Sequence, residues 1–404
     1  MSPDERPAEM ARSPDQARER VRIEPVRVRE LVAFVDRYLR TGASQAVTPL
    51  TPQRALSQSQ NPHANADDVG LLVAYVGSTC VGYQGLLPVS FVGTSGGEST
   101  VMWSTSMFVL PEYRDRLVAL QLVRAAINEN VELVLNEFSD EAGKLFRGLR
   151  FQEMPALEFL RLRVDLLNVL GHPLQLLGRS PTRARLLRAV AARGLRLTRR
   201  TGYFGVRPLY YALLSRLTRL PDGFECRAVD RVRELPIAER EHLPPARFAR
   251  GIQTVNWMLE TPWVRDDRPP TAPPYYFADT SELFRYVALE ILDANRRYRG
   301  FIVLSVRRED GRTTLKLLDR QLAHDLPRDV IRAVSLRYAR EHGADVVDLP
   351  LDLDASLGRL PLRRLLLRTV ERPYLCRASD DASPLVADRL RLRPSLADGD
   401  TAFW

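Results

Sequence analysis

The chain has 404 residues and a mass of 45.9 kDa, which at roughly 150 residues per domain predicts two or three domains and excludes a single small module. Its composition, 45% hydrophobic and 27% charged, is typical of a globular protein and excludes a fibrous repeat or a chain disordered throughout. The net charge is +9, yet residues 166–221 hold eleven arginines and no Asp or Glu, so the remainder amounts to 9 − 11 = −2.

The sequence has no pattern typical of a membrane-spanning segment, a secretory signal peptide or a metal site. No apolar stretch approaches the roughly 20 residues that cross a bilayer, and the charged first twenty residues do not form a secretory signal, so we expect a cytoplasmic protein. The three cysteines and five histidines are scattered, without the paired spacing of a disulfide framework or a zinc site. We therefore expect no metal.

The first half of the chain alternates strand and helix signals. Residues 1–20 are charged and aperiodic, which predicts a disordered leader. After them come a predicted strand at 21–26, a helix at 31–39, strands at 71–76, 80–92 and 100–109, a helix at 117–127, a strand at 131–135 and a helix at 139–149. This order predicts a mixed α/β domain over residues 21–162.

The second half repeats this order over residues 224–404. Its signals are strands at 224–229, 299–306, 313–319 and 345–349, and helices at 237–241 and 329–341. We predict a second, diverged copy of the same fold there. The Arg-rich connector, residues 163–223, is predicted to form basic amphipathic helices at 183–193 and 209–220. It could pack between the domains, or it could dock on an anionic membrane surface.

One motif carries a specific resemblance. The stretch from Ser106 to Leu122 reads Ser-Met-Phe-Val-Leu-Pro-Glu-Tyr-Arg-Asp-Arg-Leu-Val-Ala-Leu-Gln-Leu. It resembles the central motif of the GNAT acyltransferases, in which a strand ends in a V-x-P-E-Y-R turn and the next helix begins R/Q-x-x-G-x-G/A. A second patch, Ser139 to Phe151, is similar to that family's N-x-x-A-x-x-L-Y-x-x-L-G-F. The resemblance implies a mixed α/β sheet in two tandem GNAT-like domains.

Softer matches extend this resemblance to long bacterial GNAT-like proteins of exopolysaccharide synthesis and to tandem FemAB-type ligases. They are Gly82 to Pro88, Asn256 to Met258, and the stretch from Asp398 to Trp404, in which Asp398 and Asp400 read as turn residues.

The resemblance implies an acyl-CoA site in the first copy. A strand that feeds a helix N-terminus presents unpaired backbone N–H groups, and these groups bind pyrophosphate. The implied coenzyme-binding residues are Phe108, Val109, Leu110, Arg114, Asp115, Arg116, Leu117, Val118 and Ala119. Three residues depart from the family pattern: Leu117 and Arg150 replace glycines, and Phe146 replaces a tyrosine that protonates the departing thiolate.

The strand at 100–109 holds no carboxylate, so the catalytic candidates lie elsewhere. Glu137 and Asp140 are the candidate acid/base residues, with an N-terminal helix cap as the alternative role. Asp319, on the matching strand of the second copy, is a weaker candidate. The acceptor-binding candidates are Asn136, Ser139, Trp257, Tyr275 and Tyr276; the first two share the capping alternative, and the aromatic residues could instead pin a long loop.

Two functions remain open. In the first, a GNAT-type transferase moves an acyl group from acetyl-CoA or another acyl-CoA to an amine or hydroxyl of a small-molecule or glycan acceptor, such as a cell-envelope polysaccharide or a lipid-linked precursor. In the second, a catalytically reduced tandem GNAT serves as a binding or scaffold module in polysaccharide assembly. The connector has few aromatic residues among its arginines. Because bases stack on aromatic side chains, this composition does not favour nucleic-acid binding. Docking of the connector would place the protein at the periphery of the inner membrane.

Overall fold

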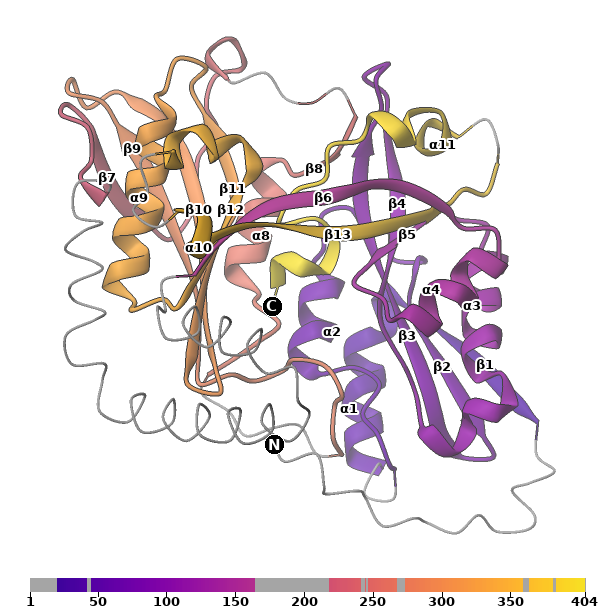
Figure 1. The fold of residues 1–404 in the computed structure, drawn as a ribbon. Coiled ribbons are helices and arrows are strands. Elements are labelled where there is room, and N and C mark those ends of the chain that lie inside the picture. The colour runs from indigo at the N-terminus through magenta and orange to yellow at the C-terminus, as the bar shows by residue number, and fades with distance from the viewer. Residues whose placement is uncertain are drawn as a thin grey trace, which may run out of the picture.

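The computed structural model describes residues 20–41, 45–163, 218–240, 244, 246–266, 273–358, 363–380 and 383–403. The described strands form one large mixed sheet that runs through the whole molecule (Figure 1). The helix predicted at 183–193 lies outside the described residues, and so do residues 209–217 of the helix predicted at 209–220 and residues 1–19 of the leader predicted at 1–20.

The first copy contains every element predicted for it, with two additions. Its elements are β1 (Val21–Arg27), α1 (Leu31–Thr41), α2 (Pro52–Ser59), β2 (Val69–Val76), β3 (Thr79–Val92), β4 (Glu98–Val109), α3 (Val118–Asn128), β5 (Leu133–Asn136), α4 (Asp140–Gly148) and β6 (Gln152–Arg163). Helix α2 and strand β6 were not predicted. Thr51 caps α2 by accepting a hydrogen bond from the Arg54 backbone N–H, and Pro52 fits the first helical position.

The second copy also contains elements at the predicted positions, together with elements that were not predicted. Its elements are β7 (Glu225–Val229), β8 (Arg247–Ala249), α8 (Ile252–Glu260), β9 (Leu283–Leu292), β10 (Tyr298–Glu309), β11 (Arg312–Leu322), α9 (Arg328–Glu341), β12 (Val346–Pro350), α10 (Arg363–Leu366), β13 (Leu367–Arg377) and α11 (Pro384–Asp388). A 3-10 turn, η8 (Gly399–Phe403), follows. The helix predicted at 237–241 is a single 3-10 turn at Ile237–Glu239. The elements that were not predicted are β8, α8, β9, α10, β13 and α11.

The strand order shows two copies of one topology. It runs β1-β2-β3-β4-β5-β13 in one half and continues β6-β12-β11-β10-β9-β7 in the other. In each half four strands pair antiparallel, the fifth runs parallel to the fourth, and the sixth is antiparallel. The sixth strand of each half comes from the other copy: β13 pairs with β5, and β6 pairs with β12. The two copies have therefore exchanged a strand.

Helices cover both faces of this sheet because its strands are apolar on both sides. In β2, Leu71 packs in the core that includes α1, and its neighbour Leu72 packs in the core that includes α3. A third core joins the copies: Phe159 of β6 is fully buried there, together with residues of α8 and of the C-terminal segment. The polar side chains of the candidate site lie on the same face of the sheet as this shared core.

Candidate functional site

The parallel strands of the first copy separate near their carboxyl ends. β4 pairs with β5 only at Met102↔Leu133 and Trp103↔Val134, after which β4 continues without that neighbour. Ser106 lies in this free part of β4 with φ +47°, where the register against β3 shifts. A Cβ on the facing Gly85 would lie 2.4 Å from the Thr105 hydroxyl oxygen, so the irregular strand requires glycine there.

Helix α3 follows with an open N-terminus. Pro111–Arg116 forms a 3-10 turn, Leu117 takes a left-handed conformation with φ +56°, and α3 then begins at Val118. No side chain caps α3, and its first turn has no acidic residue. The Leu117 side chain is 61% exposed. The backbone N–H groups of the first turn, with the helix dipole, suit an anion.

The predicted coenzyme residues divide into two sets in the structure. The side chains of Val109, Leu110 and Val118 are buried in the core beneath α3, so only their backbone could meet a ligand. The others lie at or near the surface: Phe108, Arg114, Asp115, Arg116, Leu117 and Ala119. The structure thus brings the nine residues into one strand–turn–helix unit, while contact with a coenzyme stays a prediction.

A buried arginine lies beside the irregular part of β4. Arg54 Nη1 donates to Ser106 Oγ at 2.6 Å, and its guanidinium lies over the rings of Trp263 at 4.3 Å and Tyr275 at 5.1 Å. The hydroxyl of Tyr275 is buried and has no hydrogen-bond partner among the described residues. Sequence reasoning missed Arg54, because nothing in a polar stretch marks an arginine as 2% exposed.

The aromatic acceptor candidates reach this place from the second copy. Tyr276 stacks on Phe108 with ring centroids 3.9 Å apart and is 46% exposed, so it extends the end of β4 with an accessible aromatic face. Trp257 lies in a different setting. Its Nε1 donates to the Ser57 carbonyl oxygen at 2.8 Å, and its ring packs on Phe403. Trp257 therefore joins α8 to α2 rather than a long loop to the core, and its acceptor role remains only a prediction.

The polar candidates after β5 have structural partners. Glu137, with φ +51°, forms an ion pair with Arg372 of β13 at 2.6 Å. Ser139 caps α4 by accepting from the Ala142 backbone N–H, and Asp140 is the exposed first residue of that helix. Asn136 ends β5 directly opposite Tyr374 of β13. The capping alternative holds for Ser139, and catalysis by Glu137 or Asp140 remains untested.

A carboxylate from the C-terminal turn lies among these groups. Asp400 is half-buried, and the charged side chains that act on it are Arg54 from the β4 side, and Glu137 and Arg372 from the β5 side. Burial, opposed by Arg54, raises the pKa of Asp400 from 3.8 to about 6. Asp400 thus lies in a turn, as the sequence predicted, and is in addition a half-buried, titratable carboxyl. Its pKa suits a general base near neutral pH.

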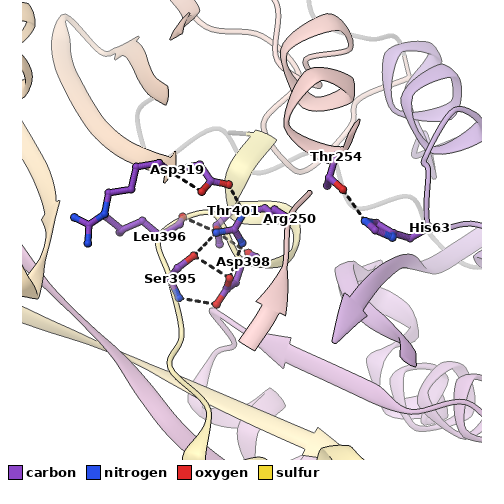
Figure 2. Close-up of polar contacts among 9 residues, drawn as sticks. His63, Arg250, Thr254, Asp319, Ser395, Leu396, Asp398 and Thr401 are labelled. Carbon is purple, nitrogen blue, oxygen red and sulfur yellow. Dashed lines mark hydrogen bonds and ion pairs between the residues drawn. The ribbon is translucent and has the colours of Figure 1, made fainter. Parts of the chain in front are cut away.

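A second network holds this turn in place (Figure 2). Arg250 donates to Asp319 at 2.6 Å, to Asp398 at 2.7 Å and to the Ser395 hydroxyl at 2.6 Å. Asp319 and Asp398 are consequently partners of one buried arginine. Asp398 also closes the turn that the sequence predicted, because its carboxylate accepts from the Ser395 backbone N–H at 2.6 Å. Figure 2 also shows His63 Nε2 hydrogen-bonded to Thr254 Oγ1 at 2.7 Å.

The equivalent helix of the second copy is less suited to an anion. Asp329 stands in the first turn of α9, where Arg332 donates to its carboxylate at 2.6 Å and to the Ser356 carbonyl oxygen at 2.9 Å. A carboxylate at that end repels an anionic ligand. The location of a coenzyme site in the first copy remains a prediction.

The pairing pattern decides the fold. In each copy an antiparallel meander leads into a strand that runs parallel to the next one, and a helix without a side-chain cap connects these two parallel strands. This is the arrangement that the sequence motifs imply. The chain carries two tandem GNAT-like folds. The predicted fold class is confirmed.

Known proteins resemble the chain in fold only. No family model and no curated protein matches it. Among solved structures, a GCN5-related N-acetyltransferase from Anabaena variabilis is 10% identical over 89% of this chain and 73% of its own, with a TM-score of 0.46. A GCN5-related N-acetyltransferase from Kribbella flavida is 13% identical over 92% and 72%, with a TM-score of 0.41. A tandem GNAT protein from the clavulanic acid biosynthesis pathway is 11% identical over 90% and 100%, with a TM-score of 0.44.

The described part of the chain has neither a metal-binding cluster nor a membrane-spanning helix. It holds no group of three or more His, Cys, Asp or Glu residues that could bind a metal ion. It also holds no helix with the length and apolar character needed to cross a membrane.

Proposed function

We propose that this protein is an acyltransferase that binds an acyl-CoA in its first copy. The observation that carries the proposal is the separation of β4 from β5 immediately before the open N-terminus of α3. The unpaired strand edge suits the amide groups of a pantetheine arm, and the helix N-terminus suits a pyrophosphate. The described residues fit this ligand except at Leu117, whose exposed side chain stands at the turn that a phosphate would approach.

The chemistry would be attack by an amine or hydroxyl on a thioester carbonyl carbon. Asp400 would accept the proton of the attacking group, since its pKa of about 6 leaves it ionised at pH 7.5. Arg54 and Arg372 would stabilise its charge before that transfer. Phe146 is 2% exposed and packs against Phe151, so it cannot supply a proton to the departing sulfur, which would take one from solvent.

The acceptor class follows the sequence expectation. We propose a glycan amine or hydroxyl, of a cell-envelope polysaccharide or a lipid-linked precursor, with Tyr276 as the accessible aromatic face for a sugar ring. The connector at 163–223 would hold the enzyme at an anionic membrane surface where such acceptors lie. Flotation with vesicles that contain or lack phosphatidylglycerol tests this part: equal recovery with both would contradict it.

The binding test uses Leu117→Asp in the full-length protein. Asp tolerates the left-handed conformation better than Leu and places a negative charge at the N-terminus of α3. The variant should fold and lose binding of coenzyme A in calorimetry. The control is Arg150→Asp, because Arg150 also has positive φ, +66°, but lies after α4. Unchanged binding by Leu117→Asp would remove the coenzyme from this turn.

A binding or scaffold role is the second candidate. Leu117 at the phosphate turn and Phe146 in place of a tyrosine both favour it, since neither helps catalysis. Acyl-CoA hydrolysis and acyl transfer to amino sugars, measured with and without Asp400→Asn, separate the two functions. Coenzyme binding without any turnover would favour the scaffold.

A further inference from the structure

A groove lies at the outer edge of the first copy, between the edge strand β1 and helix α1. Its volume is about 640 Å³, which falls within the roughly 300–1,000 Å³ of small-molecule sites. Strands β1 and β4 are three strand spacings apart, or roughly 14 Å. The groove is therefore separate from the candidate acyl site at the end of β4.

The floor of the groove is aromatic and firmly held. Phe34 and Tyr38 of α1 and Tyr75 of β2 form it, and each is more than nine-tenths buried in one core. The Tyr38 hydroxyl donates to the Val47 carbonyl oxygen at 2.6 Å, which fixes that ring. Aromatic side chains held in this way lose little conformational freedom when a ligand packs on them.

The rim carries side chains that only accept hydrogen bonds and one that only donates them. Glu24 and Glu30 are the acceptors, and Arg37 is the donor. All three already interact within the protein: Glu24 pairs with Arg22, Glu30 accepts from the Arg27 backbone N–H, and Arg37 has contacts of its own. A carboxylate has about four lone-pair sites, so both carboxylates can still accept from a neutral hydroxyl.

The groove also has an uncharged polar part, at Gln45 and Ser78. Gln45 Nε2 donates to the Ser78 carbonyl oxygen at 3.1 Å, and Gln45 Oε1 accepts from the Cys80 backbone N–H at 2.9 Å. These two bonds orient the amide and leave its second N–H for a ligand. The polar groups of the groove can thus both donate to a ligand and accept from it.

These features discriminate between classes of ligand. Two carboxylates against one guanidinium disfavour a phosphate, and a charged rim does not suit a lipid chain. Pro25 of β1 has no N–H to offer an added peptide strand. A sugar matches both parts of the groove, because its ring presents C–H groups to aromatic side chains and its hydroxyls both donate and accept.

We propose that the groove between α1 and β1 binds a neutral oligosaccharide, with sugar rings on Phe34, Tyr38 and Tyr75 and hydroxyls at Glu24, Glu30 and Gln45. This site goes beyond the proposed acyl transfer and does not depend on it. If both proposals hold, the enzyme holds a polymeric glycan acceptor at a second point, away from the reacting amine or hydroxyl. Such an acceptor would stay bound between successive transfers.

Binding of neutral trisaccharides to the full-length protein, in the absence of acyl-CoA, tests the proposal. The probes are N,N′,N″-triacetylchitotriose and maltotriose, because neither carries a charge that the connector arginines could attract. Saturation-transfer NMR detects binding, and hydrogen exchange locates it. At least one trisaccharide should protect residues 24–38 and 73–80. Binding of neither probe, or protection confined to residues 106–119, would overturn the proposal.

Two neighbouring positions on α1 provide a matched pair of variants. Ala33 is exposed in the groove, whereas Val32 is exposed on the other side of the helix. Ala33→Arg should abolish the protection by filling the groove, and Val32→Arg should leave it unchanged. Tyr75→Leu should weaken binding about fivefold, because it removes an aromatic face and keeps apolar bulk. Wild-type binding by Ala33→Arg would place the sugar elsewhere and refute the proposal.

Discussion

Two residues adopt backbone conformations that the aligned family motif assigns to glycine. Leu117 has φ +56° and Arg150 has φ +66°, and each stands where the GNAT pattern has Gly. A side chain in this left-handed region costs about 1–2 kcal/mol. Both turns therefore have a backbone that glycine adopts without strain, but neither has glycine.

Leu117→Gly should therefore stabilise the protein by about 1 kcal/mol, because Leu117 precedes α3 and a glycine there relieves strain. The same change should tighten coenzyme A binding by opening the phosphate turn. Urea unfolding and calorimetry measure the two effects. Arg150→Gly is the control, with the same gain in stability and no change in affinity. A destabilised Leu117→Gly would contradict the strain argument.

The raised pKa of Asp400 predicts an unusual pH dependence of the free energy of unfolding. Its pKa is about 6 in the folded protein and 3.8 in an exposed carboxyl, so the folded state keeps a proton that the unfolded chain releases. This contribution is complete below about pH 4 and is lost as the pH rises through 6. Asp400→Asn should match the wild type at pH 4 and exceed it in free energy of unfolding at pH 7. Asp222→Asn, at an exposed carboxylate, should follow the wild type throughout.

The C-terminal turn is the element that completes the site, and Arg250 holds it. Arg250→Met leaves Asp319 and Asp398 without their shared cation, and removal of one partner from a buried pair costs about 3–5 kcal/mol. Urea unfolding should show this loss, and hydrogen exchange at residues 395–403 should accelerate. The surface pair Arg337–Glu341 provides the control, since Arg337→Met should cost less than about 0.5 kcal/mol. Equal losses would show that the turn does not depend on Arg250.

Two of the strands that sequence reasoning missed, β6 and β13, pair with strands of the other copy. β6 contains Pro155, and β13 contains Pro373 among charged residues, a composition typical of an edge or a loop. The structure places both strands at the centre of the sheet. Pro373 lies at a shift in register. Arg161 pairs with a carboxylate on β12, and Arg372 pairs with Glu137, which directly follows β5.

The candidate site likewise has one part that the sequence predicts and one part that it does not. The strand–turn–helix at 106–119 was predictable, because its residues are contiguous and its apolar pattern is local. Arg54, Asp400 and Arg372 were not, since they come from three distant segments and only the tertiary fold brings them together. Their residue types carry no signal that separates them from the other charged residues of the chain.

At the scale of the whole molecule, the exchange of β6 and β13 predicts that neither half folds alone. Residues 1–163 lack the strand that pairs with β5, and residues 218–404 lack the strand that pairs with β12. Each half expressed alone should show no cooperative thermal transition, and the two co-expressed halves should purify as a complex. A cooperative transition of residues 1–163 near that of the intact chain would refute the prediction.

The exchanged strands also set an order of events during synthesis. The Leu149 carbonyl oxygen accepts a hydrogen bond from Arg377, 228 residues further along the chain. A domain translated first usually folds first, as the polypeptide leaves the ribosome. Here the sheet of the first copy keeps an open edge until β13 has left the ribosome. Exposed edges of this kind promote aggregation. We therefore expect the nascent chain to need protection of this edge, and the candidate site becomes complete only when both copies close together.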